Sequence, residues 1–200
     1  MGAEAGARLE RAVARRTREA RFPENKTLEA FDWNFNPKTF DRLQMEELAT
    51  GDFIRRRTNL VMVGWSGIGN SHLIQALGQK ACVHGYRVLY QTSAQLLADL
   101  TASLADKTLP ARLGAMRDKI ERSECPDAAH LLYKIIASRN QKRSTALVTN
   151  VDLEQWGEYL SDGPLAMAFL DRLVEGAIIL KVKGKSYCAE KAKALENHSA

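Results

Sequence analysis

The chain has 200 residues and a formal net charge of +5, and 45% of its residues are hydrophobic while 26% are charged. This composition is typical of a soluble globular protein, and the length suits one α/β domain with a small extension. No apolar stretch approaches the length of a membrane span, and the basic N-terminus has no apolar signal segment, so we expect a cytoplasmic protein. The three cysteines lack C-x-x-C spacing, which argues against a disulfide framework and a zinc site.

Residues 1–50 are interpreted as a basic helical arm followed by an aromatic linker. Residues 4–20 are rich in alanine, arginine and glutamate and contain no proline, so they predict a charged helix. The linker then carries an unusual density of aromatic side chains: Phe22, Phe31, Trp33, Phe35 and Phe40. We expect these rings to attach the arm to the main domain. A stacking surface for bases is the alternative.

Two groups of arginines are candidate contacts for a nucleic-acid backbone. One group lies in the arm and the other directly precedes the first predicted strand. Such patches bind phosphates without reading sequence. The candidates are Arg15, Arg16, Arg18, Arg55, Arg56 and Arg57. A solvated helical face is the alternative explanation for the same charges.

Strands and helices alternate through residues 51–187, which we interpret as the main domain. A short helix at 40–50 comes first. Strands are expected at 60–63, 87–90, 145–149 and 177–182. Helices are expected at 70–84, 94–104, 109–122, 127–140 and 164–175. This alternation predicts an α/β fold with three layers, a parallel sheet covered by helices on both faces. Residues 188–200 are expected to form a flexible tail.

The first strand runs into a glycine-rich turn, and the sequence NLVMVGWSGIGNSH at 59–72 is the most informative stretch of the chain. It meets the phosphate-loop pattern G-x-x-x-x-G-K-[ST] except at the lysine, which is replaced by Asn70. Glycines let successive N–H groups face one anion, and the following helix adds its positive end. The candidate nucleotide contacts are Gly64, Trp65, Ser66, Gly67, Ile68, Gly69, Asn70, Ser71 and His72. The alternative is a tight strand-to-helix turn with no ligand.

One substitution at the centre of this pattern affects the expected chemistry. Ser71 stands where a hydroxyl would ligate Mg²⁺, but Asn70 is neutral and cannot balance the charge of a triphosphate. Hydrogen bonds to charged groups contribute roughly 1.5–3 kcal/mol, so binding should weaken about ten- to a hundredfold. Hydrolysis should suffer more, because charge builds up in the transition state.

A second element of phosphate-loop ATPases is also missing from the sequence. Between residues 90 and 145 no apolar run ends in an acidic pair that could hold Mg²⁺ and activate water. The acids that precede the helix at 127–140 have polar neighbours: Asp118, Glu121, Glu124 and Asp127. We therefore expect a sheet that lacks one central strand and a protein that is impaired in hydrolysis.

Five strings, in order, resemble the IstB-like ATP-binding proteins, helper ATPases of bacterial insertion-sequence transposition that are related to the helicase loader DnaC. They are ARFPENKTLEAFDWNFNP (20–37), LATGDFIRRRTNLVMVGWSGIGNSHLIQALG (48–78), GYRVLYQTSAQLLADLTASLADKTL (85–109), RSTALVTNVDLEQWGEYLSD (143–162) and LAMAFLDRLVEGAIILKVKGKSY (165–187). The resemblance implies a P-loop NTPase domain of AAA+ type, ATP with Mg²⁺ as ligand, homo-oligomers on DNA, and a transposase partner.

The resemblance also implies roles for two further residues and shows where this chain departs from the family. Asn150 matches the polar sensor that positions the attacking water, and Arg172 matches the arginine that reaches a neighbouring subunit's nucleotide. Besides Asn70 and the missing acidic strand, Cys188 stands where the resemblance implies a second sensor arginine. From the same resemblance we expect the family's N-terminal DNA-binding portion to be reduced here to the short arm.

These observations lead to one expected function and two alternatives. We expect an ATP-binding helper of DNA transposition whose ATPase activity is weak or lost. The first alternative is a nucleotide-independent protein that binds DNA or a transposase through its arginines. The second is a decayed remnant without function.

Overall fold

The computed structural model describes residues 2–105, 128–187 and 189–190. Several expectations from the sequence fall outside these residues: the helix at 109–122, the acids of the missing strand, Cys188, and most of the tail. Among the described residues, no helix combines the length and the apolar character needed to cross a bilayer.

Three parallel strands form the sheet of the described chain, in the order β2 (Ala146–Thr149), β1 (Leu60–Gly64) and β3 (Ile178–Val182). All five residues of β1 are buried, as expected for the central strand of a covered parallel sheet. Val63 pairs with Thr149 on one side and with Lys181 on the other. The carboxyl ends of all three strands therefore meet at one edge.

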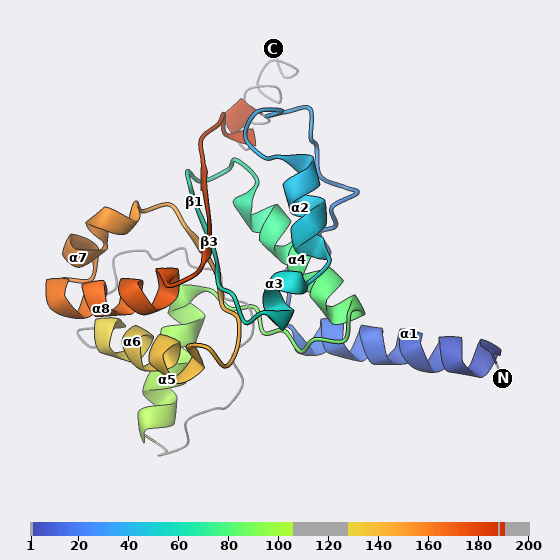
Figure 1. Ribbon diagram of the computed structural model, residues 1–200, viewed down its shortest axis with the longest axis horizontal. Coiled ribbons are helices and arrows are strands. Elements are labelled where there is room, and N and C mark those ends of the chain that lie inside the picture. Colours follow the sequence, from blue (N-terminus) through green and yellow to red (C-terminus); the bar gives the residue numbers. More distant parts are fainter. Residues whose placement is uncertain (1, 106–127, 188, 191–200) are drawn as a thin grey trace, which may run out of the picture.

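Helices cover both faces of this sheet (Figure 1). One face carries α2 (Arg42–Ala49), α3 (Asp52–Arg55) and α4 (Asn70–Val83). The other face carries α5 (Ser93–Ala105), α6 (Ala128–Arg139), α7 (Trp156–Tyr159) and α8 (Gly163–Val174), with a 3-10 turn at Leu153–Gln155. Alternate side chains of β1 enter the two cores, Leu60 and Met62 on the α4 side and Val61 and Val63 on the α8 side. The predicted three-layer α/β class is confirmed.

The strand predicted at 87–90 does not form. Residues 86–90 have no strand pairing, and the Tyr90 N–H donates to the Ala20 carbonyl at 2.8 Å, directly beyond α1 (Gly2–Glu19). A strand needs a neighbour to complete its hydrogen bonds, and no described strand lies on the outer side of β2. The RVLY pattern is typical of a half-buried extended surface, but it carries no information on whether a partner strand exists.

The aromatic linker packs against the main domain, as expected. The ring of Phe31 makes edge contacts with Trp33 and Phe40, at centroid distances of 4.8 Å and 5.7 Å. Phe22 packs at 5.9 Å from Tyr90 and against Gly78 of α4. Most of these aromatic rings therefore contribute to the core on the α4 face.

Hydrogen bonds also join the linker to the segment that follows β3. Asn36 donates its Nδ2 to the Lys185 carbonyl at 2.8 Å and accepts the Lys185 N–H at Oδ1, 3.1 Å away. The Thr39 hydroxyl donates to the Lys183 carbonyl at 2.9 Å. No pattern in the sequence indicated this pairing between residues almost 150 positions apart.

One buried amide joins the amino ends of all three strands. The side chain of Asn59, directly before β1, accepts the Thr145 N–H at 2.9 Å and donates to the Leu173 carbonyl of α8 at 2.9 Å. Its main-chain carbonyl accepts the Ile178 N–H at 2.9 Å. The residue is only 8% exposed, so water cannot replace these bonds easily.

We expect Asn59→Ala to lower the free energy of unfolding by roughly 2–4 kcal/mol, because two buried main-chain groups lose their partners at about 1–3 kcal/mol each. Urea unfolding followed by circular dichroism measures this loss. Asn34→Ala is the matched control, since Asn34 is exposed and should change stability by less than about 0.5 kcal/mol. Equal effects of the two substitutions would show that the amide is not a structural clamp.

Candidate nucleotide-binding site

The glycine-rich loop joins the carboxyl end of β1 to the first turn of α4. Gly67 and Gly69 have φ of +85° and +112°, a region that L side chains rarely adopt. Gly64 is required for a different reason, because a Cβ there would lie 2.7 Å from the Val182 carbonyl of the neighbouring strand. Strand pairing and turn geometry thus each demand glycine.

The main-chain N–H groups of this loop have no internal partners. Within the described part of the chain, no acceptor is hydrogen-bonded to the N–H groups of residues 65–71. The first bonded amides are those of His72 and Leu73, which both donate to the Gly69 carbonyl at 3.0 Å. The free donors lie at the positive end of the 14-residue helix α4. This arrangement can receive a phosphate group.

Two segments from distant parts of the sequence hold the loop in shape. Phe31 of the linker covers Gly69, where a Cβ would lie 2.7 Å from the ring. From the other end of the chain, Ser186 packs on Gly67, and the Tyr187 N–H donates to the Gly67 carbonyl at 2.9 Å. Sequence reasoning missed these contacts. The aromatic density of the linker was a signal, but it did not show which part of the domain the rings would cover.

The flanking residues of the candidate site differ in exposure. Trp65 is 73% exposed, whereas the His72 ring is bonded to the Thr27 carbonyl at 2.7 Å and lies edge-on to Phe31. The His72 ring therefore anchors the linker to α4.

Asn70, at the position of the expected lysine, is turned toward the strand. Its Nδ2 donates to the Gly64 carbonyl at 3.2 Å, and the residue is only 5% exposed. Its Oδ1 is buried and has no hydrogen-bond partner among the described residues. A lysine would reach phosphate oxygens as a point charge, whereas this amide stays within the base of the loop. The loop therefore has the free amides that can bind a phosphate, but it lacks the lysine cation.

Of the two further predicted site residues, Asn150 lies beside the loop and Arg172 lies far from it. Asn150 follows Thr149, the partner of Val63, so the register places it beside Gly64 at the same edge. Arg172 is exposed in the last turn of α8, 3.7 Å from Glu175. Leu173 next to it is bonded to Asn59 before β1, so Arg172 lies at the opposite edge. Within one chain it cannot reach a ligand in the loop.

The residues present fit a triphosphate better than they fit a dedicated metal site. Ser71, half-buried in the first turn of α4, is the predicted Mg²⁺ ligand. No group of three His, Cys, Asp or Glu side chains that could hold a metal occurs among the described residues. Mg²⁺ commonly binds through few protein groups plus phosphates and water. The free amides would hold the phosphates, and Ser71 with phosphate oxygens would hold the ion.

The six candidate nucleic-acid arginines lie outside this site, in α1 and in or directly after α3. Arg55 and Arg56 are paired with Asp52, at 3.1 Å and 3.4 Å. Arg57 donates to the Gln141 carbonyl at 3.2 Å. Arg57 lies at the edge of the sheet formed by the amino ends of the strands. The loop lies at the opposite edge, formed by their carboxyl ends.

The packing of Phe31 on the loop can be tested with two glycines of similar backbone conformation. Gly69→Ala should lower the free energy of unfolding by roughly 2–4 kcal/mol, from backbone strain and from overlap with the ring. Gly85→Ala is the control, because Gly85 has φ +94° but open space around its Cβ position. It should cost only the strain, about 1 kcal/mol. Equal losses in denaturant unfolding would rule out the contact with Phe31.

Comparison with known proteins agrees with this geometry. The IstB-like ATP binding protein family model matches residues 1–194. A putative ATP-binding protein of insertion sequence IS21 from Pseudomonas aeruginosa is 36% identical over 200 residues, covering 94% of this chain and 74% of the relative. A putative ATP-binding protein of IS5376 from Geobacillus stearothermophilus is 32% identical, covering 84% of this chain and 70% of the relative.

The fold also matches solved structures. The crystal structure of DnaI superposes with a TM-score of 0.61 at 18% identity, covering 79% of this chain and 91% of that protein. This likeness shows the fold, a P-loop AAA+ domain with a small parallel sheet. The family match over residues 1–194 and the 36% identical relative show that the chain belongs to the IstB-like ATP binding protein family.

Proposed function

We propose that this protein is an ATP-binding helper of insertion-sequence transposition that binds its nucleotide weakly and hydrolyses it poorly. The observation that carries the proposal is the loop itself: its amides have no internal partners in the described chain, while the side chain at the lysine position is buried and neutral. Family membership supports ATP as the nucleotide.

The residues of the loop would divide the work of binding. The N–H groups of residues 65–71 would hold the phosphates, and Ser71 would take part in holding Mg²⁺. Asn150, at the tip of the neighbouring strand, would orient the attacking water. Because Asn70 adds no positive charge, developing charge in the transition state is stabilised less than in an intact phosphate loop.

Self-assembly would supply the remaining cation. Arg172 is exposed and lies at the edge of the sheet away from its own loop, so it can act only on the nucleotide of a neighbouring subunit. An arginine supplied in trans stabilises transition-state charge and ties turnover to assembly. We propose a homo-oligomer that works on DNA with the transposase of the same insertion sequence, in the cytoplasm.

Restoring the lysine tests the nucleotide site directly. Asn70→Lys should tighten the binding of a fluorescent ATP analogue about ten- to a hundredfold, because a charge-assisted hydrogen bond is gained. Turnover of ATP should stay near background, because the sequence between 90 and 145 has no apolar run ending in an acidic pair. Asn70→Met, with similar length and no charge, is the control and should not tighten binding.

Two results would contradict this reading. Vigorous ATPase activity of Asn70→Lys would show that an acid outside the expected pattern completes the site. No saturable binding by the native protein or by Asn70→Lys at millimolar nucleotide would remove the nucleotide proposal altogether.

A nucleotide-independent DNA-binding protein is the second candidate. It is favoured by several arginines near the amino ends of the strands that have no described carboxylate partner. Duplex or single-stranded DNA binding that is salt-dependent and identical with and without ATP would support it.

A further inference from the structure

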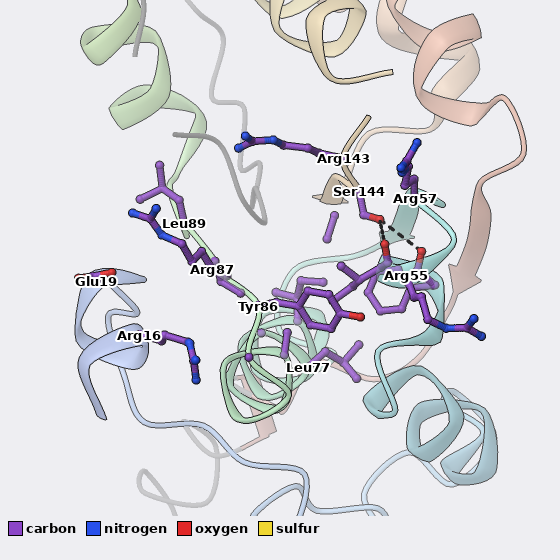
Figure 2. Close-up of a pocket in the computed structure, with 18 of the residues that line it drawn as sticks. Arg16, Glu19, Arg55, Arg57, Leu77, Tyr86, Arg87, Leu89, Arg143 and Ser144 are labelled. Atoms are coloured by element: carbon purple, nitrogen blue, oxygen red, sulfur yellow. Dashed lines mark hydrogen bonds between the residues drawn. The ribbon is translucent and has the colours of Figure 1, made fainter. Parts of the chain in front are cut away.

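A basic cavity of about 820 Å³ opens at the amino ends of the strands, opposite the glycine-rich loop (Figure 2). Its walls come from the end of α1, the last turns of α4, residues 85–89, the α3 region and residues 142–146. Figure 2 shows Arg16 and Arg87 on one side and Arg57 on the other, with Tyr86 between them, while Arg143 extends above them toward the side of Arg87. Basic side chains from segments far apart in the sequence thus line one cavity.

Positive charge dominates the lining. Nine lysines and arginines line the cavity, against a single carboxylate, Glu19. Six of the nine have no carboxylate within ion-pair distance in the described chain: Arg16, Arg18, Arg21, Arg57, Arg87 and Lys142. Arg16 and Arg57 make only main-chain contacts, to the Cys82 and Gln141 carbonyls. Several like charges without counter-charges favour a ligand with several negative charges.

The lowered pKa of a buried arginine in the cavity lining also favours an anionic ligand. Arg139 is 6% exposed, and burial together with the charge of Arg143 lowers the pKa of Arg139 to about 10. An additional negative charge in the cavity would relieve both effects.

The shape of the cavity limits what can enter it. A hollow of this volume suits a ligand of drug size and is too small for a double helix, whereas one or two nucleotides of a single strand would fit. Tyr86 presents an aromatic ring at the centre, with its Cε2 3.2 Å from the Cβ position of Gly51, where glycine leaves room for it. Basic grooves combined with aromatic rings are typical of single-strand binding.

We propose that this cavity binds the phosphate backbone of a single DNA strand, as a second anion site at the opposite edge of the sheet from the glycine-rich loop. This proposal rests on the proposed function, in which DNA is a partner, and specifies where on the protein the DNA binds. The two sites are separated by the length of β1, about 16 Å for five residues. Helix α4 joins them, with its first turn in the loop and the Cys82 carbonyl of its last turn bonded to Arg16.

The test compares two double variants with the same loss of charge. Arg18→Gln/Arg87→Gln removes two exposed cations of the cavity whose side chains make no described hydrogen bond or ion pair. Arg8→Gln/Arg11→Gln removes two exposed arginines of α1 that do not line it. Binding of a fluorescein-labelled 20-nucleotide single strand is measured by anisotropy over a salt series, with the matched duplex in parallel.

We expect the cavity variant to make the negative slope of log K against log salt shallower by about 1.4 and to weaken binding roughly tenfold or more. The control should stay within about twofold of the native protein. Millimolar ATP with Mg²⁺ should not displace the strand, and the cavity variant should keep native binding of fluorescent ATP, because the loop lies at the other edge. The single strand should bind more tightly than the duplex.

Three results would overturn the proposal. Equal losses in the two double variants would assign DNA binding to overall charge, and preference for the duplex would exclude the single-strand cavity. Absence of DNA binding by the native protein at low salt would remove the site together with the DNA partner, while leaving the nucleotide loop untouched. If the double variant melts below the native protein, Arg87→Gln against Arg8→Gln repeats the comparison.

Discussion

The pairing of β1 with a parallel strand on each side determines where every candidate functional group lies. All five residues of β1 are buried, so the strand cannot shift without exposing both cores. Its carboxyl end delivers the glycine-rich loop beside Asn150, and its amino end is held to β2, β3 and α8 by Asn59. The two proposed anion sites therefore lie at opposite edges of one small sheet.

The loop shows how the shape of a site can persist when part of its chemistry is lost. Each glycine is required by a packing contact, Gly64 by Val182, Gly67 by Ser186 and Gly69 by Phe31. These contacts would favour glycine even without a ligand. The more informative observation is that the amides of residues 65–71 have no acceptor among the described residues, so they are available to a ligand. That arrangement remains suited to a phosphate.

The two proposed anion sites depend on different physical effects. In the loop, neutral N–H groups and the helix dipole act over a short range and require a precise backbone. In the cavity, flexible arginine and lysine side chains supply full charges, so recognition tolerates many backbone positions but weakens with salt. Helix α4 extends from the loop to the cavity. In the proposed function, a rigid helix therefore connects the nucleotide site to the DNA site.

The sequence by itself determined the three strands within one or two residues, the loop, and the edge that Asn150 occupies, because apolar periodicity and glycine spacing are local properties. Only the tertiary structure decided that residues 87–90 lack a partner strand, that Asn70 bonds to Gly64, and that Arg87 faces the end of α1. These features depend on contacts between segments that are far apart in the sequence. A local sequence pattern does not indicate how such segments pack, so only the tertiary structure shows them.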